Sequence, residues 1–288
     1  MHAPLTFEAL TIGFFAALAL AAPWTRAPRE RRRRAIARSV AFAAAAAAAS
    51  YVLSPDIRLW LGHAYLVAGY RLPALLVPAG PGPAEAGRYV QNGVAPDPGS
   101  PIPDPGSPIP DPEPFEAWLV RTDDRWFPFR LTLPAWAQQV LELSYLFCYL
   151  LVPAAFIFVW MTALAADVDR FWTAVLLAGF ACYGLLPWLV SSPPRVRRSE
   201  SPDTAAGLRR LNLWILSRAS HGYNTFPSGH VAVSIAAALV VLSLAPSAGV
   251  AALVIALAIG SGAVAGGYHH VTDVLAGAAV GAAAALLT

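Results

Sequence analysis

Apolar runs long enough to cross a bilayer recur along this 288-residue chain, and they limit its folds more than any other feature. A transmembrane helix needs about 20 mostly apolar residues in succession. A backbone inside lipid must also satisfy its own hydrogen bonds, which favours helices over open sheets. The sequence therefore predicts an all-α, polytopic transmembrane helical bundle with about 6–8 membrane segments.

Composition and charge agree with a membrane protein. Hydrophobic residues make up 57% of the chain and charged residues only 13%. A net charge of +3 in so apolar a chain indicates membrane topology rather than nucleic-acid binding, so we expect no nucleic-acid partner. Cys148 and Cys182 both fall inside apolar runs, which is typical of small core residues rather than a disulfide.

A tract rich in Pro, Gly and Asp divides the chain. Within residues 79–114, the sequence PDPGSPI occurs at 96–102 and again at 103–109. Such a tract cannot form a core, and we expect an extended, solvent-exposed linker. The sequence then predicts N-terminal membrane helices in 1–78 and a catalytic helical bundle in 115–288.

Three apolar runs precede the linker. Runs 9–23 and 35–53 are expected to span the membrane, and the arginine cluster between them predicts a cytoplasmic anchor. A lipid-binding or partner-binding site is the alternative for that cluster. Run 57–78 contains several charged residues, and spanning, re-entering and lying in the interface all remain open. The cluster consists of Arg26, Arg29 and Arg31 to Arg34.

Further helices are expected after the linker. Residues 115–129 mix Trp and Phe with Arg and Asp, a pattern typical of an interfacial amphipathic helix, with a substrate gate as the alternative. Spanning helices are predicted at 136–164, with a kink at Pro153, and at 171–190. A last apolar run extends from residue 274 to the C-terminus.

Pro246 interrupts the longest apolar stretch and predicts a helical hairpin. The apolar runs 231–245 and 248–265 lie on either side of it. A hairpin returns the chain to the membrane face that it left. His230, before the first run, and His269, after the second, are then expected to meet at one face, and we place the chemistry there.

The residues at the start of the first of these runs suit phosphate chemistry. Ser228 is a good N-cap residue, Gly229 permits close approach to the backbone, and a helix N-terminus attracts anions. His230 would be well placed to give a proton to a bound phosphate ester. The plain alternative is an ordinary interfacial histidine at a helix start.

Two further groups favour the same chemistry. His269 and Asp273 are four residues apart and share one face of a helix, so the carboxylate can orient the imidazole and support its positive charge. A charge-assisted pair that only caps the last helix is the alternative. Arg195 follows two prolines and presents a guanidinium suited to bidentate phosphate binding, or else it is simply one more interfacial arginine.

Two other functions, metal binding and transport, fit the sequence less well. His269, His270 and Asp273 together could form part of a metal site, but adjacent histidines point to different faces of a helix. We therefore expect no metal and no other cofactor. A transporter would carry polar residues at mid-membrane depth, whereas the ionisable groups here gather at the ends of the apolar runs.

Taken in order, three motifs resemble the type 2 phosphatidic acid phosphatase (PAP2) superfamily over about half the chain, residues 136–288. They are PPR at 193–195, PSGH at 227–230 and YHHVTDVLAG at 268–277. The resemblance implies a helical bundle and metal-independent cleavage or transfer of phosphate esters through a phosphohistidine.

The resemblance also implies roles for individual residues. By position, His269 resembles the nucleophile, Asp273 its orienting partner, and His230 the acid that protonates the leaving alcohol. Ser228 and Gly229 resemble the phosphate-binding part of the second motif. With Arg195, they are the predicted phosphate-binding residues.

Two departures from the family pattern stand out. The first motif usually has a Lys and an Arg-Pro pair, but this chain has no Lys and Val196 follows Arg195. The third motif usually opens with Ser-Arg, where this chain has Gly262 and Ala263. One phosphate-binding cation is therefore missing, and these departures resemble the branch of inositol-phosphoceramide synthase-type phosphotransferases. The candidates to replace the cation are Arg197, Arg198, Arg209, Arg210, Arg218 and His270.

The sequence thus predicts a membrane enzyme, a phosphatase acting on a lipid-linked phosphate. A lipid phosphotransferase with an alcohol acceptor is the alternative, and a non-enzymatic protein with a degenerate site is the further one. The resemblance implies a plasma-membrane location with an extracytoplasmic site, whereas the positive-inside rule applied to the arginine-rich segment 191–229 favours the cytoplasm.

Overall fold

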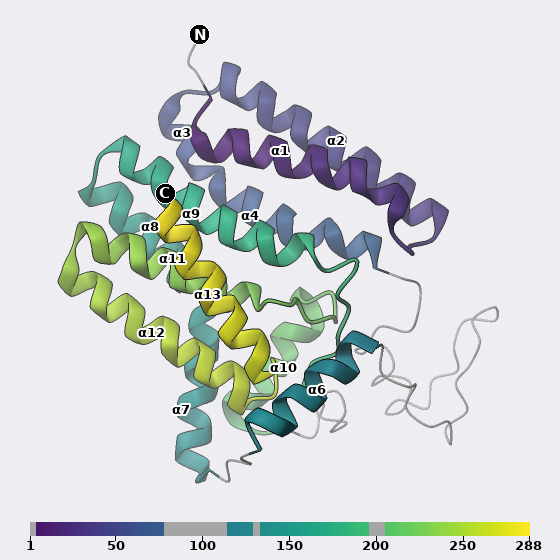
Figure 1. Cartoon of the computed structure of the whole chain (residues 1–288). Helices are drawn as coiled ribbons and strands as arrows, with labels where there is room; N and C mark the ends of the chain where they lie inside the picture. Colours follow the sequence, from purple (N-terminus) through teal and green to yellow (C-terminus); the bar gives the residue numbers. More distant parts are fainter. Residues whose placement is uncertain (1–3, 78–113, 129–132, 196–204) are drawn as a thin grey trace.

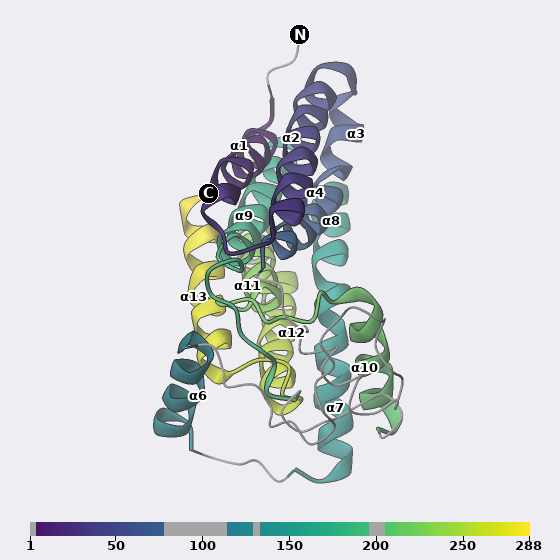
Figure 2. The same cartoon turned by 90° about the vertical axis from the view of Figure 1, so that its right-hand side faces the viewer.

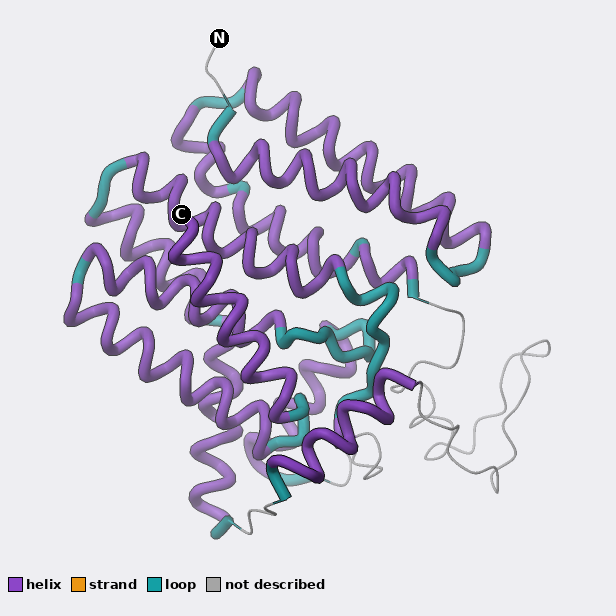
Figure 3. Tube along the Cα trace, in the orientation of Figure 1, coloured by secondary structure: helices purple, strands orange, loops and turns teal. Residues whose placement is uncertain are grey.

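The computed structural model describes residues 4–77, 114–128, 133–195 and 205–288. Within these ranges the regular structure consists of helices joined by loops, as Figure 3 shows, so the predicted all-α class is confirmed there. The predicted linker 79–114 lies outside the described residues, apart from Pro114.

The N-terminal helices pack onto the rest of the bundle rather than standing apart from it (Figure 1). α1 (Thr6–Ala21) and α2 (Arg29–Val52) lie along each other, and α1 also contacts α9 (Ala165–Gly184). Phe14 of α1 stacks on Phe180 of α9 with ring centroids 4.1 Å apart. The early and late helices therefore share one apolar core.

The third predicted run, 57–78, is broken into short pieces. α3 (Pro55–Trp60) and α4 (Gly62–Arg71) are followed by the 3-10 turn η2 (Pro73–Leu76). Pro73 ends the helical pattern, because proline lacks the N–H that the helix interior requires. None of these pieces is long enough to be a candidate span, so a single spanning helix over this run is not supported.

α6 (Pro114–Trp126) is amphipathic, as the pattern at 115–129 predicted. Leu119 is fully buried, whereas Trp118 and Trp126 are exposed. Figures 1 and 2 both show α6 beside the start of the last helix, and the two helices are in contact. The interfacial position of α6 stays a prediction.

The predicted span 136–164 bends before its proline. α7 (Ala135–Leu146) and α8 (Leu151–Thr162) are bent by 51° about a break that follows η3 (Phe147–Tyr149). Our expectation of a kink at Pro153 is therefore wrong. Pro153 lies in the first turn of α8, where the N–H that it lacks would have no partner within the helix.

The predicted hairpin is confirmed. It consists of α11 (Gly229–Leu244) and α12 (Pro246–Ala265), and Pro246 is the first residue of α12, where its fixed φ suits a helix start. α11 contacts α9, α12 and α13 (Val271–Leu287) and so lies inside the bundle.

By length and composition, three helices of the described chain are candidate membrane spans, or four if α7 and α8 form one bent span. The three are Thr6–Trp24, Arg29–Val52 and Pro246–Ala265. α11 and α13 are apolar but shorter. Several membrane segments are thus supported, and the larger number of about 6–8 is not.

Candidate functional site

Three segments, each carrying one of the sequence motifs, meet at one end of the α11–α12 hairpin. They are residues 191–195 (first), 224–230 (second) and 266–273 (third). One backbone hydrogen bond joins each pair of segments. Asn224 N donates to Ser191 O (2.8 Å), Arg195 N to Gly267 O (2.9 Å), and Ser228 N to Asp273 O (2.9 Å). Because these groups belong to the main chain, backbone hydrogen bonds link the three segments directly to one another.

His230 and His269 lie close to each other, as the hairpin predicted. Their ring centroids are 6.4 Å apart and their planes are inclined at 81°. His230 is the second residue of α11, and His269 lies in the loop that follows α12. The hairpin therefore returns the chain to the end from which it started.

His269 contacts Asp273, but not as two residues of one helix. α13 begins at Val271, so His269 precedes it, and our expectation of a shared helical face is wrong. The contact forms because the Asp273 carboxylate turns back across the first turn of α13. Its Oδ2 atom lies 3.3 Å from His269 Nδ1 and accepts the N–H of His270 at 3.0 Å. An ionised carboxylate only accepts hydrogen bonds, so this contact favours a proton on Nδ1 of His269 and leaves Nε2 on the side of the ring away from Asp273.

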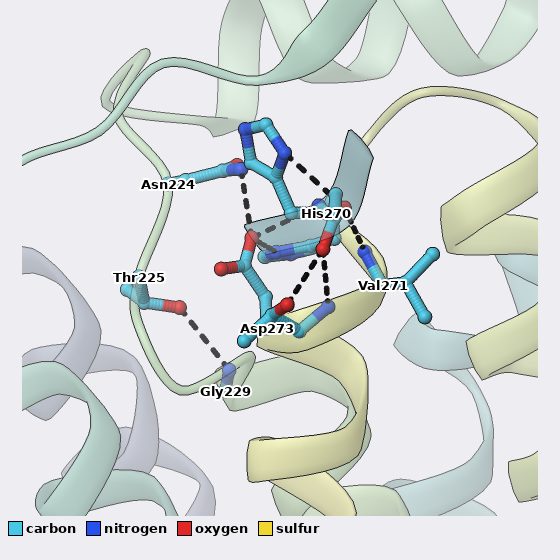
Figure 4. Close-up of polar contacts among 9 residues, drawn as sticks. Asn224, Thr225, Gly229, His270, Val271 and Asp273 are labelled. Carbon is cyan, nitrogen blue, oxygen red and sulfur yellow. Dashed lines mark hydrogen bonds and ion pairs between the residues drawn. The ribbon is translucent and has the colours of Figure 1, made fainter. Parts of the chain in front are cut away.

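Asp273 is fully buried and receives a further hydrogen bond. Asn224 Nδ2 donates to the same Oδ2 atom at 3.3 Å, as Figure 4 shows. Sequence reasoning missed Asn224. Its position shortly before PSGH, in a polar stretch between helices, is the only signal that points to it.

Ser228 occupies the N-cap position of α11, but its hydroxyl makes no capping hydrogen bond. The Ser228 side chain is buried, and its Oγ has no partner among the residues that the structure describes. The N–H of Gly229 donates instead to Thr225 Oγ1 at 3.1 Å (Figure 4). A Cβ on Gly229 would lie 2.1 Å from the Tyr183 ring, so this glycine makes room for an aromatic side chain.

Arg195 is a buried cation without an anion. Its side chain is 9% exposed, and no carboxylate in the described part of the chain forms an ion pair with it. Its guanidinium lies over the Tyr268 ring, 5.4 Å from the centroid. Burial lowers the pKa of Arg195, and the nearby charge of Arg209 lowers it further. An uncompensated buried charge is costly, so this site favours an incoming anion.

Of the candidates for the missing cation, the structure brings Arg209 to the site. Arg209 belongs to α10 (Gly207–Ala219). Its Nη1 atom donates to Gly266 O at 2.6 Å and pairs with Glu142 Oε1 at 2.8 Å. The guanidinium carbon lies 4.9 Å from the Tyr268 ring centroid. Arg209 therefore stands beside the turn that leads into the third motif.

The other candidates lie elsewhere or are otherwise engaged. Arg210 and Arg218 are exposed on α10, and Arg218 stacks on Trp214. His270 Nδ1 lies 3.4 Å from Asp123 Oδ2 on α6. Arg197 and Arg198 lie outside the described residues.

A buried polar network holds Tyr268, the residue before His269. Its hydroxyl donates to Glu142 Oε2 at 2.5 Å, and Asn212 Nδ2 donates to the same oxygen at 2.5 Å. Tyr145 stacks on the Tyr268 ring, with centroids 4.0 Å apart. Sequence reasoning missed Glu142, although a lone carboxylate within an apolar run is the kind of residue that marks a functional position.

Two cavities meet at His269. One has a volume of about 910 Å³, and its lining includes Asp123, Gln139, Glu142, Arg209, His269 and His270. The other, of about 20 Å³, is lined by groups that include Tyr70, Arg195, Asn224, His230, Tyr268 and His269. The small cavity suits one water molecule, whereas the large one suits a small organic group.

The two adjacent histidines turn to different carboxylates. His269 faces Asp273, and His270 faces Asp123. Within the described ranges, no group of three or more His, Cys, Asp or Glu residues is arranged to hold a metal ion.

Comparison with known proteins adds one match. Residues 171–288 match the model of the PAP2 superfamily. No curated protein and no solved structure matches the chain. The match is to the superfamily as a whole and gives no support to the inositol-phosphoceramide synthase-type branch. It covers all three motif segments and leaves α1 to α8, with α6 and α7 among them, outside.

Proposed function

We propose that this protein is an integral membrane phosphatase that hydrolyses a lipid-linked phosphate ester through a phosphohistidine, a proposal supported by the match of residues 171–288 to the PAP2 superfamily model. The observation that carries the proposal is the arrangement around His269. Its imidazole is backed by a buried carboxylate, a second imidazole lies 6.4 Å away, and a buried guanidinium beside it has no ion-pair partner in the described part of the chain.

In this proposal Arg195 and Arg209, whose guanidinium groups both lie over the Tyr268 ring, bind the phosphate. Guanidinium groups match the oxygens of a phosphate with paired hydrogen bonds. The N-terminus of α11, at Ser228 and Gly229, adds partial positive charge. Arg209 thereby takes the place of the cation that the third motif lacks.

In the first step, His269 Nε2 attacks phosphorus. The N–P bond forms while the bond from phosphorus to the lipid oxygen breaks, and its electron pair leaves with that oxygen. His230, which carries a second ring proton while the anionic phosphate ester is bound beside it, gives that proton to the departing alkoxide, so the lipid alcohol leaves neutral. Asp273 stabilises the positive charge that develops on His269.

In the second step, water resolves the intermediate. His230, now neutral, takes a proton from a water molecule while the water oxygen bonds to phosphorus. The N–P bond breaks and its electron pair returns to His269 Nε2. Inorganic phosphate leaves, and both histidines regain their starting states.

Phosphotransfer is the second candidate. The cavity of about 910 Å³ borders His269 and is large enough for an alcohol acceptor. If such a hydroxyl replaces water in the second step, the product is a new phosphate ester. A site with neither activity, in a non-enzymatic membrane protein, is the third candidate.

We propose a plasma-membrane location with the site on the extracytoplasmic side. Asp124 is exposed and borders the large cavity, which makes it a suitable reporter. A cysteine in its place should react with a membrane-impermeant maleimide on intact cells. The native Cys148 and Cys182 are buried, so they should contribute little labelling of their own. Labelling only after the cells are permeabilised would contradict the proposed side.

The function is tested by phosphate release from a panel of lipid phosphates in detergent, with EDTA present throughout. We expect release by the wild type, and a loss on the order of 10²–10⁴-fold or more in His269→Ala. His63→Ala is the control, because His63 lines neither cavity.

Other outcomes separate the three candidates. No phosphate release from the wild type, but formation of a new ester when alcohols are added, would replace hydrolysis by transfer. Neither product, or equal release from wild type and His269→Ala, would contradict both enzymatic proposals.

A further inference from the structure

α6 contacts each of the three segments that build the site, although it lies outside the range matched to the superfamily. Glu116 Oε2 accepts the N–H of Ser192 in the first segment at 3.2 Å. Phe115 packs edge-on against Phe226 in the second, with centroids 5.1 Å apart. Asp123 bonds to the start of α13 in the third segment. One helix therefore links all three.

The contact of Asp123 with α13 is the most extensive of these. Its Oδ2 accepts the N–H of Val271 at 2.7 Å, and its Oδ1 accepts the N–H and the hydroxyl of Thr272 at 3.0 and 2.6 Å. Figure 4 draws the bond to the Val271 amide. The first N–H groups of a helix have no partner within it, and a carboxylate satisfies them with a favourable charge. A neighbouring helix thus supplies the anion for the start of α13.

The same turn of α13 carries the groups that hold His269. Asp273 contacts His269 through its carboxylate and receives Ser228 N–H through its carbonyl. Val271, whose N–H Asp123 accepts, lies two residues from His269 and two residues from Asp273. A shift of this turn would therefore move the imidazole and loosen its link to the second segment.

We propose that α6 is a clamp that holds the three site segments in register, with Asp123 as the positioning residue that acts on His269. The effect on turnover rests on the proposed function. The effect on the segments does not, because it can be measured without a substrate.

The test compares full-length wild type, Asp123→Ala and Asp123→Asn in detergent. Asp167→Asn is the matched control, because the Asp167 carboxylate, like that of Asp123, accepts a backbone N–H at the start of a helix, here the N–H of Leu164 at the N-cap of α9. It lies ~24 Å along α9 from Tyr183, which lines the small cavity, at ~1.5 Å per residue. Amide hydrogen exchange is measured at the N–H groups that Asp123 accepts and at the three backbone donors that join the segments. The values of kcat and KM are measured with the lipid phosphate that the wild type hydrolyses.

In Asp123→Ala we expect amide exchange at Val271 and Thr272 to rise on the order of 10- to 100-fold, because two charge-assisted hydrogen bonds are lost. Exchange should also rise, by about tenfold, at the three inter-segment donors. These donors are Asn224, Arg195 and Ser228. We expect kcat to fall ~10²-fold with KM nearly unchanged, since a misplaced nucleophile slows chemistry more than binding. Asp123→Asn keeps one accepting oxygen and should recover part of both effects.

Three results would overturn the proposal. The first is faster exchange confined to Val271 and Thr272, which would make Asp123 only a local helix cap. The second is a fall in kcat of the same size in Asp167→Asn, which would indicate general destabilisation. The third is unchanged kcat despite faster exchange at all the inter-segment donors, which would remove Asp123 as the positioning residue for His269. If the wild type has no turnover, the proposed function fails. The exchange rates at the three inter-segment donors still test whether α6 holds the segments together.

Discussion

At the scale of single residues, two arginines approach one aromatic ring. Arg195 and Arg209 lie 5.4 and 4.9 Å from the Tyr268 centroid and border different cavities. Arg209 pairs with Glu142, whereas Arg195 has no carboxylate partner in the described chain. The Arg195 guanidinium is therefore not balanced by a carboxylate among the described residues, which favours an anionic ligand over a neutral one.

We predict that Arg209→Lys weakens phosphate binding. Lysine keeps the charge for Glu142 but lacks the planar fork that matches phosphate oxygens. We expect the inhibition constant of inorganic phosphate to rise about tenfold, with a smaller change in kcat. Arg218→Lys, on the exposed face of the same helix, is the control and should leave that constant unchanged. An unchanged constant in Arg209→Lys would remove Arg209 from the phosphate site.

His270 and Asp123 form a pair whose stability contribution depends on pH. Burial alone would lower the pKa of His270, but the hydrogen bond to Asp123 and the charges of Asp273, Asp123 and Glu116 outweigh it and raise this pKa. Burial alone would raise the pKa of Asp123, but hydrogen bonds, first from His270 and then from Thr272 and Val271, lower it. Both shifts favour the charged pair.

The sign of the pH effect follows from these shifts. The contribution of His270 is complete below its ordinary pKa of 6.5 and is lost as the pH rises through the raised value. We expect the difference in Tm between wild type and Asp123→Asn to be larger at about pH 5.5 than at about pH 8.5. Thermal unfolding in detergent at the two pH values measures it. A difference that grows towards alkaline pH would contradict the charged pair.

At the scale of helices, small residues allow α13 to lie directly against α11. A Cβ on Gly277 would lie 2.5 Å from Ser228 O, and one on Gly281 would lie 2.3 Å from Ala232 O. Glycines four residues apart let helix backbones approach closely. The same approach allows Ser228 N to reach Asp273 O, so helix packing and site geometry depend on one contact.

Gly277→Ala should therefore damage both stability and activity. The added methyl group meets backbone, which cannot move aside, and we expect a cost of about 1–3 kcal/mol, measured as a lower Tm. Gly13→Ala is the control, because a Cβ there meets no atom within 4 Å. It should be neutral or stabilising by up to ~1 kcal/mol, as alanine favours helix. Equal Tm values for the two variants would contradict the close approach.

At the scale of the whole molecule, the N-terminal helices are part of the body that contains the site. Tyr70 of α4 lines the small cavity together with His230. α1 is tied to α3 by the ion pair between Glu8 and Arg58, whose side chains are 0% and 1% exposed. A change in the packing of the N-terminal helices should therefore alter the small cavity, because Tyr70 forms part of its lining.

We predict that Arg58→Met destabilises the protein strongly. It leaves the Glu8 carboxylate buried without its partner, at a cost on the order of 3–5 kcal/mol. The Tm and the rate of phosphate release should both fall. The double variant with Glu8→Gln should recover most of each loss. If the double variant is no better than Arg58→Met alone, the ion pair is not the cause of the loss.

The sequence predicted the site more completely than it predicted the helices. Order and spacing indicated His230, His269 and Asp273, and the structure brings them together. Helix ends were less predictable, because Pro153 is compatible with both a kink and a first turn. The roles of these residues, and of Arg195, Ser228 and Gly229 as phosphate-binding groups, stay predictions until the assays are done.

What the sequence by itself determined is the helical class, the hairpin at Pro246 and the motifs that meet at its open end. These follow from local rules, since apolar length, proline and motif order can be read along the chain. Only the tertiary structure decided which arginine of α10 lies beside Tyr268, and that α6 and Glu142 contact the segments that carry the motifs. Their partners are far away in sequence, and no local pattern records which side chains the packing of helices will bring within hydrogen-bond reach.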